Sequence, residues 1–216
     1  MSETPAMRVI AIDGPAGAGK STVGRAVAKR LGLGYLDTGA MYRAVTFAAL
    51  RRAMDPADQE AVGILAESIE LKLDDDTVLV DGVDAKIEIR GREVTSAVSA
   101  VASNSHVRSE LVRRQRVWVA DHGGGVVEGR DIGSVVFPDA TIKLFITASP
   151  RVRAQRRVSE MGGDLDEVEA AIVERDRKDS TREDSPLHQA SDSLVVDTSD
   201  LTIDEVVEQV IGLIPE

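Results

Sequence analysis

The stretch Val9-Ile10-Ala11-Ile12-Asp13-Gly14-Pro15-Ala16-Gly17-Ala18-Gly19-Lys20-Ser21-Thr22 decides the fold of this chain. Its first residues form a short apolar run rich in β-branched side chains, which is typical of a buried strand. Residues 14–21 then fit the pattern G-x-x-x-x-G-K-[ST], and a helical pattern with Val23, Val27 and Leu31 on one face follows directly. A strand, a glycine-rich loop and a helix in this order predict a nucleoside triphosphate site.

The residue types of the loop suit a triphosphate. Glycines let consecutive backbone N–H groups converge on phosphate oxygens, and the helix N-terminus adds a partial positive charge. Lys20 would contact the β- and γ-phosphates as a catalytic cation, and the hydroxyl of Ser21, with Thr22 beside it, would ligate Mg²⁺. A bland turn that caps a helix needs neither the lysine nor the serine. We therefore expect ATP to be bound by Gly14, Pro15, Ala16, Gly17, Ala18, Gly19, Lys20, Ser21 and Thr22.

Composition narrows the class of protein. The 216 residues fit one domain with an inserted lobe, and 43% hydrophobic residues with 3% aromatics predict an aliphatic core. A net charge of −11 disfavours a general nucleic-acid binder. The chain has no cysteine, which excludes disulfides and suits a reducing compartment. We expect a cytoplasmic monomer with a disordered tail at residues 1–6, no membrane span and no nucleic-acid partner.

Alternation along the chain predicts an α/β fold. Five short apolar runs, at residues 8–13, 33–37, 125–128, 142–147 and 193–197, are separated by helical patterns. This order favours a three-layer P-loop fold with a five-stranded parallel sheet. Residues 71–73, 77–80 and 86–89 break the alternation and, with turn signals at 74–76 and 81–82, predict a small antiparallel insert.

Two predicted strands end in charged residues, where ligands bind in a doubly wound sheet. After the second strand, Arg43 could pair with an acceptor phosphate, assisted by the hydroxyl of Thr38, although Asp37-Thr38 also fits a helix N-cap. After the third strand, Glu128 suits Mg²⁺ or its waters, Arg130 suits a phosphate, and Asp131 could accept a hydrogen bond from a base amino group. A charged loop with an internal Arg–Asp pair remains the alternative.

Two arginine clusters follow. Arg153, Arg156 and Arg157 have the spacing of one helical face, and Gly162-Gly163 then suggests a hinge. A second helix leads to further candidates, Arg175, Asp179 and Arg182. Two helices joined by a flexible turn predict a lid that excludes water and places charge on the transferred phosphoryl group. The alternative is a solvated charged hairpin neutralised by neighbouring carboxylates.

Taken together, these residues resemble the bacterial cytidylate kinase family of the nucleoside monophosphate kinase group. The resemblance runs from the phosphate-binding loop through Leu36-Asp-Thr-Gly-Ala-Met-Tyr-Arg43, Val107-Arg-Ser-Glu-Leu-Val-Arg-Arg-Gln-Arg116, Gly129-Arg-Asp-Ile-Gly-Ser-Val-Val-Phe-Pro-Asp139 and Glu174-Arg-Asp-Arg-Lys-Asp179 to Ser193-Leu-Val-Val-Asp-Thr198. It implies transfer of the γ-phosphoryl group of MgATP to CMP or dCMP in pyrimidine nucleotide metabolism. It also implies a P-loop kinase domain at 7–216, with a core at about 7–37, 103–150 and 186–216, an acceptor-binding insert at about 38–102 and a lid at about 151–185.

The resemblance also implies roles for individual residues. Cytosine would be read by Ser99, Arg108 and Asp131, and Arg43 and Arg130 would bind the CMP phosphate. The implied CMP-binding set is Thr38, Tyr42, Arg43, Ser99, Arg108, Gly129, Arg130, Asp131, Arg175, Asp179 and Arg182. The implied ATP side adds Arg153, Arg156 and Arg157, the catalytic residues are Lys20, Arg130, Arg153 and Arg157, and the metal residues are Ser21 and Glu128.

Three residues depart from the pattern of the family without removing a charge. Glu128 stands in place of an aspartate, Thr38 in place of a serine, and Ala16 in place of a serine within the loop. Two other functions stay open at this point. One is a P-loop kinase with a different acceptor, such as UMP, AMP or a non-nucleotide alcohol. The other is a nucleotide-dependent switch that binds ATP and transfers nothing.

Overall fold

The computed structural model describes residues 7–74 and 77–214, so the tail expected at 1–6 and residues 75–76 of the expected turn lie outside the described residues. The described chain divides into two compact units. The first comprises residues 7–35, 119–181 and 185–214, and the second comprises Leu36–Trp118 and Arg182–Asp184. Within the described ranges, no helix is long and apolar enough to cross a membrane.

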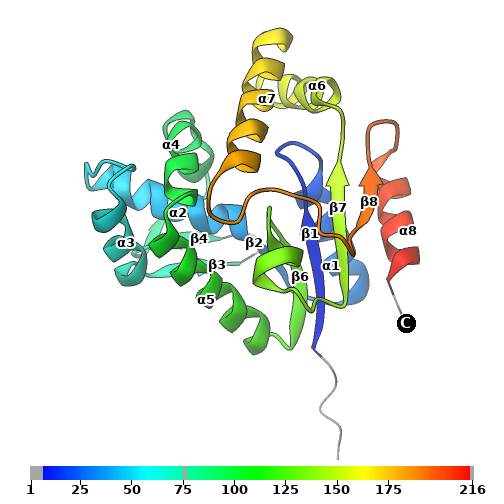
Figure 1. The fold of residues 1–216 in the computed structure, drawn as a ribbon, viewed down its shortest axis with the longest axis horizontal. Helices are drawn as coiled ribbons and strands as arrows, with labels where there is room; N and C mark the ends of the chain where they lie inside the picture. Colours follow the sequence, from blue (N-terminus) through cyan, green and yellow to red (C-terminus); the bar gives the residue numbers. More distant parts are fainter. Residues whose placement is uncertain (1–6, 75–76, 215–216) are drawn as a thin grey trace, which may run out of the picture. The chain divides into compact units, whose positions relative to one another are not determined.

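The main sheet has five strands in the order β2-β6-β1-β7-β8 (Figure 1), and all of them except the last two residues of β2 belong to the first unit. The strands are β1 Arg8–Asp13, β2 Tyr35–Asp37, β6 Gly124–Glu128, β7 Ile142–Thr147 and β8 Leu194–Asp197. The central strand β1 pairs in parallel with β6 and β7, and β7 pairs in parallel with β8. All five predicted strands are thus confirmed, to within two residues at each end.

The helices of this unit are α1 Lys20–Leu31, α6 Pro150–Met161, α7 Leu165–Thr181, α8 Ile203–Leu213 and the short π-helix η2 Ile132–Val136. Helices α6 and α7 pack against each other as the expected helical hairpin. Helix α8 begins at a capping box, in which the Thr202 hydroxyl accepts from the Glu205 N–H and the Glu205 carboxylate accepts from the Thr202 N–H.

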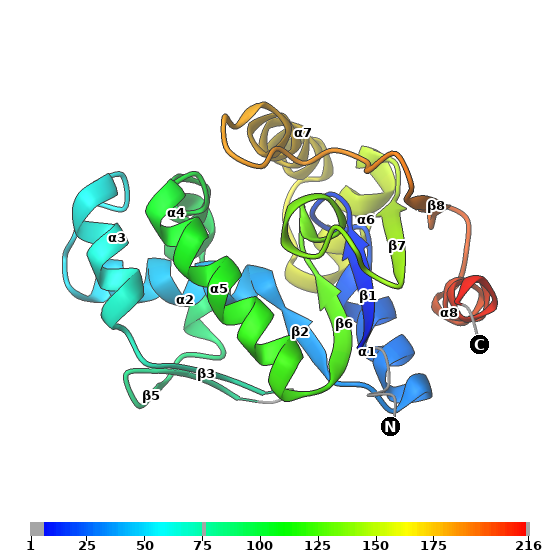
Figure 2. The ribbon, with the colours of Figure 1, turned by 60° about the horizontal axis from the view of Figure 1, so that its bottom comes forward.

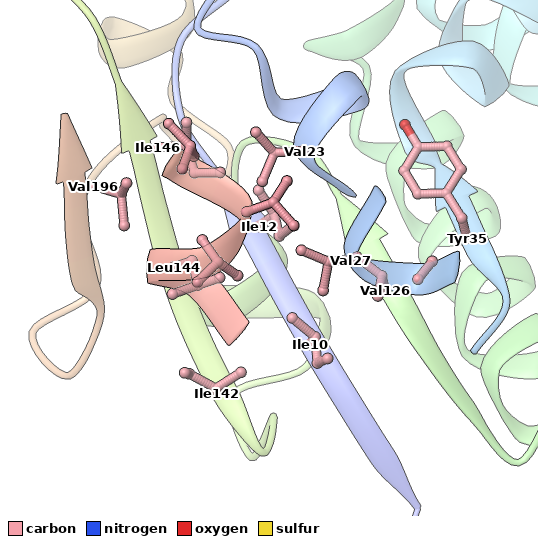
Figure 3. Close-up of a cluster of buried hydrophobic side chains, with 14 of the residues drawn as sticks. Ile10, Ile12, Val23, Val27, Tyr35, Val126, Ile142, Leu144, Ile146 and Val196 are labelled. Atoms are coloured by element: carbon pink, nitrogen blue, oxygen red, sulfur yellow. The ribbon is translucent and has the colours of Figure 1, made fainter. Parts of the chain in front are cut away.

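The core of the first unit lies between the sheet and helices α1 and α8. Figure 3 shows Ile10 and Ile12 of β1 with Leu144 and Ile146 of β7 in one buried layer, and Val23 belongs to the same cluster. Successive strand residues point to opposite faces of a sheet. Since Ile12 faces α1, the next residue of β1, Asp13, faces the other side.

The second unit consists of helices and a small sheet that lies at one side of them (Figure 2). Its elements are α2 Thr38–Arg51, α3 Gln59–Ser68, β3 Leu71–Leu73, β4 Val78–Val80, β5 Val83–Asp84, the 3₁₀ turn η1 Glu88–Arg90, α4 Arg92–Ala102 and most of α5 Ser105–Asp121. The strands β3, β4 and β5 are antiparallel, as predicted for the insert. The prediction of a strand at residues 86–89 is wrong. The third strand of the insert is the two-residue β5, and Ile89 belongs to the 3₁₀ turn, from which its side chain enters the core.

Candidate active site

The phosphate-binding loop lies where the sequence places it, between β1 and α1. Gly14 has φ +144°, and a Cβ there would lie 1.9 Å from the carbonyl oxygen of Ile146, so this position requires glycine. Within the described residues, no side chain caps the N-terminus of α1, which begins at Lys20. The side chain of Lys20 is buried and its Nζ donates to the carbonyl oxygen of Pro15 at 2.9 Å. The Lys20 side chain therefore folds back over the phosphate-binding loop.

The two candidate metal residues lie side by side. The Ser21 hydroxyl donates to Glu128 Oε1 at 2.8 Å, although the two residues are 107 positions apart in the chain. Glu128 is buried at the end of β6, next to β1 in the sheet. A hydroxyl and a carboxylate at this separation fit Mg²⁺, which takes few protein ligands and keeps waters and substrate phosphates as the others.

A cavity of about 620 Å³ opens beside this loop within the first unit. Its lining includes most of the predicted ATP-binding residues: Gly17, Ala18, Gly19, Lys20, Ser21, Thr22, Arg153, Arg156 and Arg157. At another part of the lining lie Leu201, Ile203 and Val206, at the start of α8, with Thr198 after β8. These four residues were missed from the sequence, where the only signal is that they follow the last strand at its carboxyl end.

Arg153 is tied to the protein at all three guanidinium nitrogens. Its Nε donates to the Ala148 carbonyl oxygen at 2.9 Å, and one terminal nitrogen donates to the Ala16 carbonyl oxygen of the phosphate-binding loop at 3.1 Å. The other terminal nitrogen pairs with Asp176 of α7 at 2.6 Å. Its side chain is only 4% exposed. Arg153 therefore joins the loop, α6 and α7, and Asp176 is a partner that the sequence did not reveal.

The other two arginines of α6 differ from Arg153. Arg156 donates to the hydroxyl of Thr198 at 3.0 Å and to its carbonyl oxygen at 2.6 Å. Within residues 7–74 and 77–214, Arg157 makes no hydrogen bond or ion pair, and it lines the cavity. Of the three predicted ATP-side arginines, Arg157 is thus the one whose donors no described residue engages.

Four further candidates cluster in the first unit. Arg130 pairs with Asp179 at 2.9 Å, and Asp131, also buried, follows Arg130 in the loop after β6. Arg175 lies nearby, and its Nε is buried without a hydrogen-bond partner among the described residues. Burial, and then the charge of Arg130, lowers the pKa of Arg175 from its usual value. A desolvated guanidinium beside another guanidinium gains from a bound anion.

The second unit holds the remaining acceptor candidates. Arg43 donates to the Ile89 carbonyl oxygen and to the Thr95 hydroxyl, both at 2.9 Å. Arg108 is 3% exposed, lies 5.7 Å from the centre of the Tyr42 ring and pairs with Asp184 at 3.6 Å. Tyr42 and Arg108 therefore lie next to each other in this unit.

The other candidates of this unit lie on its helices and in its short segment Arg182–Asp184. Thr38 is buried in the first turn of α2, and Asp37 caps that helix by accepting from the Ala40 N–H at 2.9 Å. The capping reading of Asp37 is confirmed. Ser99 lies on α4 and is partly buried, while Arg182 follows α7 and belongs to the second unit by its contacts.

A P-loop at the end of a parallel sheet, a lysine folded over it and an arginine-rich helical hairpin define a P-loop kinase. A gluconokinase structure from Sinorhizobium meliloti 1021 has the same fold, with a TM-score of 0.52, 16% identity, and coverage of 96% of this chain and 91% of that one. A sequence profile described as "Cytidylate kinase" matches residues 10–216, and the chain belongs to the cytidylate kinase family. The resemblance found in the sequence is therefore confirmed.

Individual relatives agree with the family. The chain is 51% identical to the cytidylate kinase of Corynebacterium efficiens, over 95% of this chain and 93% of that protein. It is also 51% identical to the bifunctional pantoate ligase/cytidylate kinase of Prochlorococcus marinus, over 99% of this chain, but spans only 44% of that longer protein.

Proposed function

We propose that this chain transfers the γ-phosphoryl group of MgATP to CMP or dCMP, giving ADP and CDP or dCDP, in pyrimidine nucleotide metabolism. The observation that carries the proposal is the cavity of about 620 Å³ that joins the phosphate-binding loop to the arginines of α6. Family membership supports a cytidine nucleotide as the acceptor.

ATP would bind with its phosphates on the loop at residues 14–19 and on Lys20. The nucleoside would extend toward the apolar end of the cavity, at Leu201, Ile203 and Val206. Ser21 and Glu128 would hold Mg²⁺, directly or through water. The metal would supply positive charge for the β- and γ-phosphate oxygens.

The acceptor residues implied by the resemblance are assigned within each unit separately. In the first unit, Gly129, Arg130, Asp131, Arg175 and Asp179 would contact CMP, with Arg130 on its phosphate and Asp131 accepting from the cytosine amino group. In the second unit we assign the acceptor role to Thr38, Tyr42, Arg43, Ser99, Arg108 and Arg182. Arg175 supports this role, because its unpaired Nε is already desolvated.

The chemistry needs no general base. The CMP phosphate is largely ionised at neutral pH and can attack the γ-phosphorus of ATP in line. Lys20, Arg130, Arg153 and Arg157 are the proposed catalytic residues: Lys20 and Arg157 would neutralise charge on the transferred group, and Arg153 would hold the loop against α6. The helical hairpin α6–α7, within the proposed lid at about 151–185, would exclude water.

We further propose a cytoplasmic monomer that acts on small nucleotides and has neither a nucleic-acid nor a membrane partner. A net charge of −11 supports the absence of a nucleic-acid partner, since it repels a phosphate backbone. The proposed division of residues 7–216 assigns 38–102 to acceptor binding and the remainder outside the lid to the core.

The test offers CMP, dCMP, UMP, AMP and shikimate separately to the purified protein with MgATP and measures ADP production. Rapid turnover with CMP and dCMP, and little with the others, is the expected result. Activity with another acceptor alone would overturn the cytosine assignment and keep the kinase. ATP binding without acceptor-dependent ADP release would replace the kinase by a nucleotide switch.

A further inference from the structure

The proposed reaction leaves one buried carboxylate without a role. Asp13 ends β1, directly before Gly14 of the phosphate-binding loop, and is 7% exposed. A buried carboxylate costs folding free energy unless it is paired or hydrogen-bonded. Its position in the fold must therefore be explained by what it binds.

Asp13 binds the backbone of the loop that follows β6. Its two carboxylate oxygens accept from the N–H groups of Ile132 and Gly133, each at 2.8 Å. These residues open the π-helix η2, and within the described residues its N-cap residue Asp131 supplies no side-chain capping hydrogen bond to it. The cap of this short helix is thus supplied from β1, more than 100 residues earlier in the chain.

The same end of β1 also binds the beginning of that loop, at Gly129. The Gly129 N–H donates to the carbonyl oxygen of Ile12 at 2.9 Å. Arg130 and Asp131 therefore lie between two anchors, and both anchors are on consecutive residues of β1. A two-residue segment fixed at both ends has little freedom to place its side chains differently.

The two N–H groups that Asp13 accepts from explain why a carboxylate suits position 13. Two neighbouring N–H groups point at one side chain, and an ionised carboxyl group offers an acceptor oxygen to each. An amide of the same shape offers one oxygen and one NH₂ group, so one N–H would face another donor. Asparagine at position 13 would therefore displace the start of η2 while keeping the volume of the side chain.

We propose that Asp13 is a positioning residue for the acceptor, which acts by fixing Arg130 and Asp131 through the backbone of Ile132 and Gly133. The inference rests on the proposed function, because it takes Arg130 and Asp131 as the CMP-binding pair. Asp13 lies next to the loop that would bind the ATP phosphates, yet by this inference it fixes the residues that bind the acceptor CMP. Selectivity for CMP then depends on a group that never touches the nucleotide.

The experiment measures initial rates for the wild type and Asp13→Asn, varying CMP at saturating ATP and then ATP at saturating CMP. Wild-type turnover with CMP comes first, since its absence would refute the proposed function and not this inference. In the variant we expect kcat/KM for CMP to fall by about 10- to 100-fold, and KM for ATP to change by less than about threefold. We also expect the preference for CMP over UMP to narrow.

The matched control is Asp139→Asn, which makes the same chemical change at an exposed residue that follows η2. It should leave both KM values unchanged. Equal losses for CMP and ATP in Asp13→Asn would show that Asp13 serves the phosphate-binding loop or the fold as a whole, and unchanged CMP kinetics would also overturn the inference.

A second variant covers the case in which Asp13→Asn does not fold. Asp13→Glu keeps the charge and lengthens the side chain by one methylene, so it should push the start of η2 away and give the same acceptor-selective loss. If kcat/KM in this variant falls as much for ATP as for CMP, the inference is contradicted.

Discussion

The ionisation of Asp13 should determine part of the dependence of folding stability on pH. Burial raises the pKa of this carboxyl from 3.8 to about 6; the backbone N–H groups of Gly133 and Ile132 and the charge of Lys20 oppose the rise, while Asp131 adds to it. In the unfolded chain the pKa returns to its ordinary value. One pKa unit corresponds to about 1.4 kcal/mol, so a shift of about two units corresponds to about 3 kcal/mol.

The sign follows from which state holds the proton more tightly. The pKa is higher in the folded state, so the contribution of Asp13 to stability is complete below the unfolded pKa and is lost as the pH rises through about 6. Roughly half of the change, about 1.4 kcal/mol, falls between about pH 5 and about pH 8.

The assay is urea unfolding followed by circular dichroism, for the wild type and for Asp13→Asn, across that pH range. The free energy of unfolding of the wild type minus that of the variant should fall by about 1.4 kcal/mol as the pH rises. Taking the difference removes the titration of every group whose pKa the substitution leaves unchanged. The same difference for Asp139→Asn should be flat. A wild-type-minus-Asp13→Asn difference that is flat, or that rises with pH, would refute the reasoning.

Three substitutions test other parts of the site. Lys20→Ala should lower kcat/KM by about a thousandfold or more, because it removes charge from the transferred phosphoryl group; near-normal turnover would contradict the assignment of the loop. Asp131→Ala should raise KM for CMP much more than KM for ATP, and equal losses would indicate a structural role. Asp176→Asn leaves the buried Arg153 charge without its counterion, so the free energy of unfolding should fall by about 3 kcal/mol in urea titrations; an unchanged value would show that the ion pair is not needed.

The sheet was predictable because the buried strands are encoded locally. Apolar runs rich in β-branched residues, such as residues 8–13 and 142–147, are typical of buried strands when helical patterns separate them along the chain. The insert was less predictable. Residues 86–89 resemble a strand in composition, but only Ile89 is buried, and one inward side chain fits a single 3₁₀ turn as well as a strand.

Motifs revealed the residues of the site better than their contacts. The Ser21–Glu128 pair follows from a motif and from a strand end, and the structure brings the two together. Asp13 could not be found in this way, because its partners are backbone N–H groups that every sequence carries. Arg153 was predicted to bind ATP, and the sequence gives no sign that Ala16 and Ala148 carbonyl oxygens occupy its donors.

The contacts of Arg153 also bear on the design of inhibitors for this pocket. Among the arginines of α6 that line the cavity, Arg153 and Arg157 differ greatly in how available their donors are. Arg153 faces Ala148, Ala16 and Asp176 with its three nitrogens, and a compound would have to break one of these bonds to gain a donor there. Arg157 carries no such cost among the described residues. A carboxylate or phosphonate placed to reach Arg157 should therefore gain more affinity per added atom than one directed at Arg153.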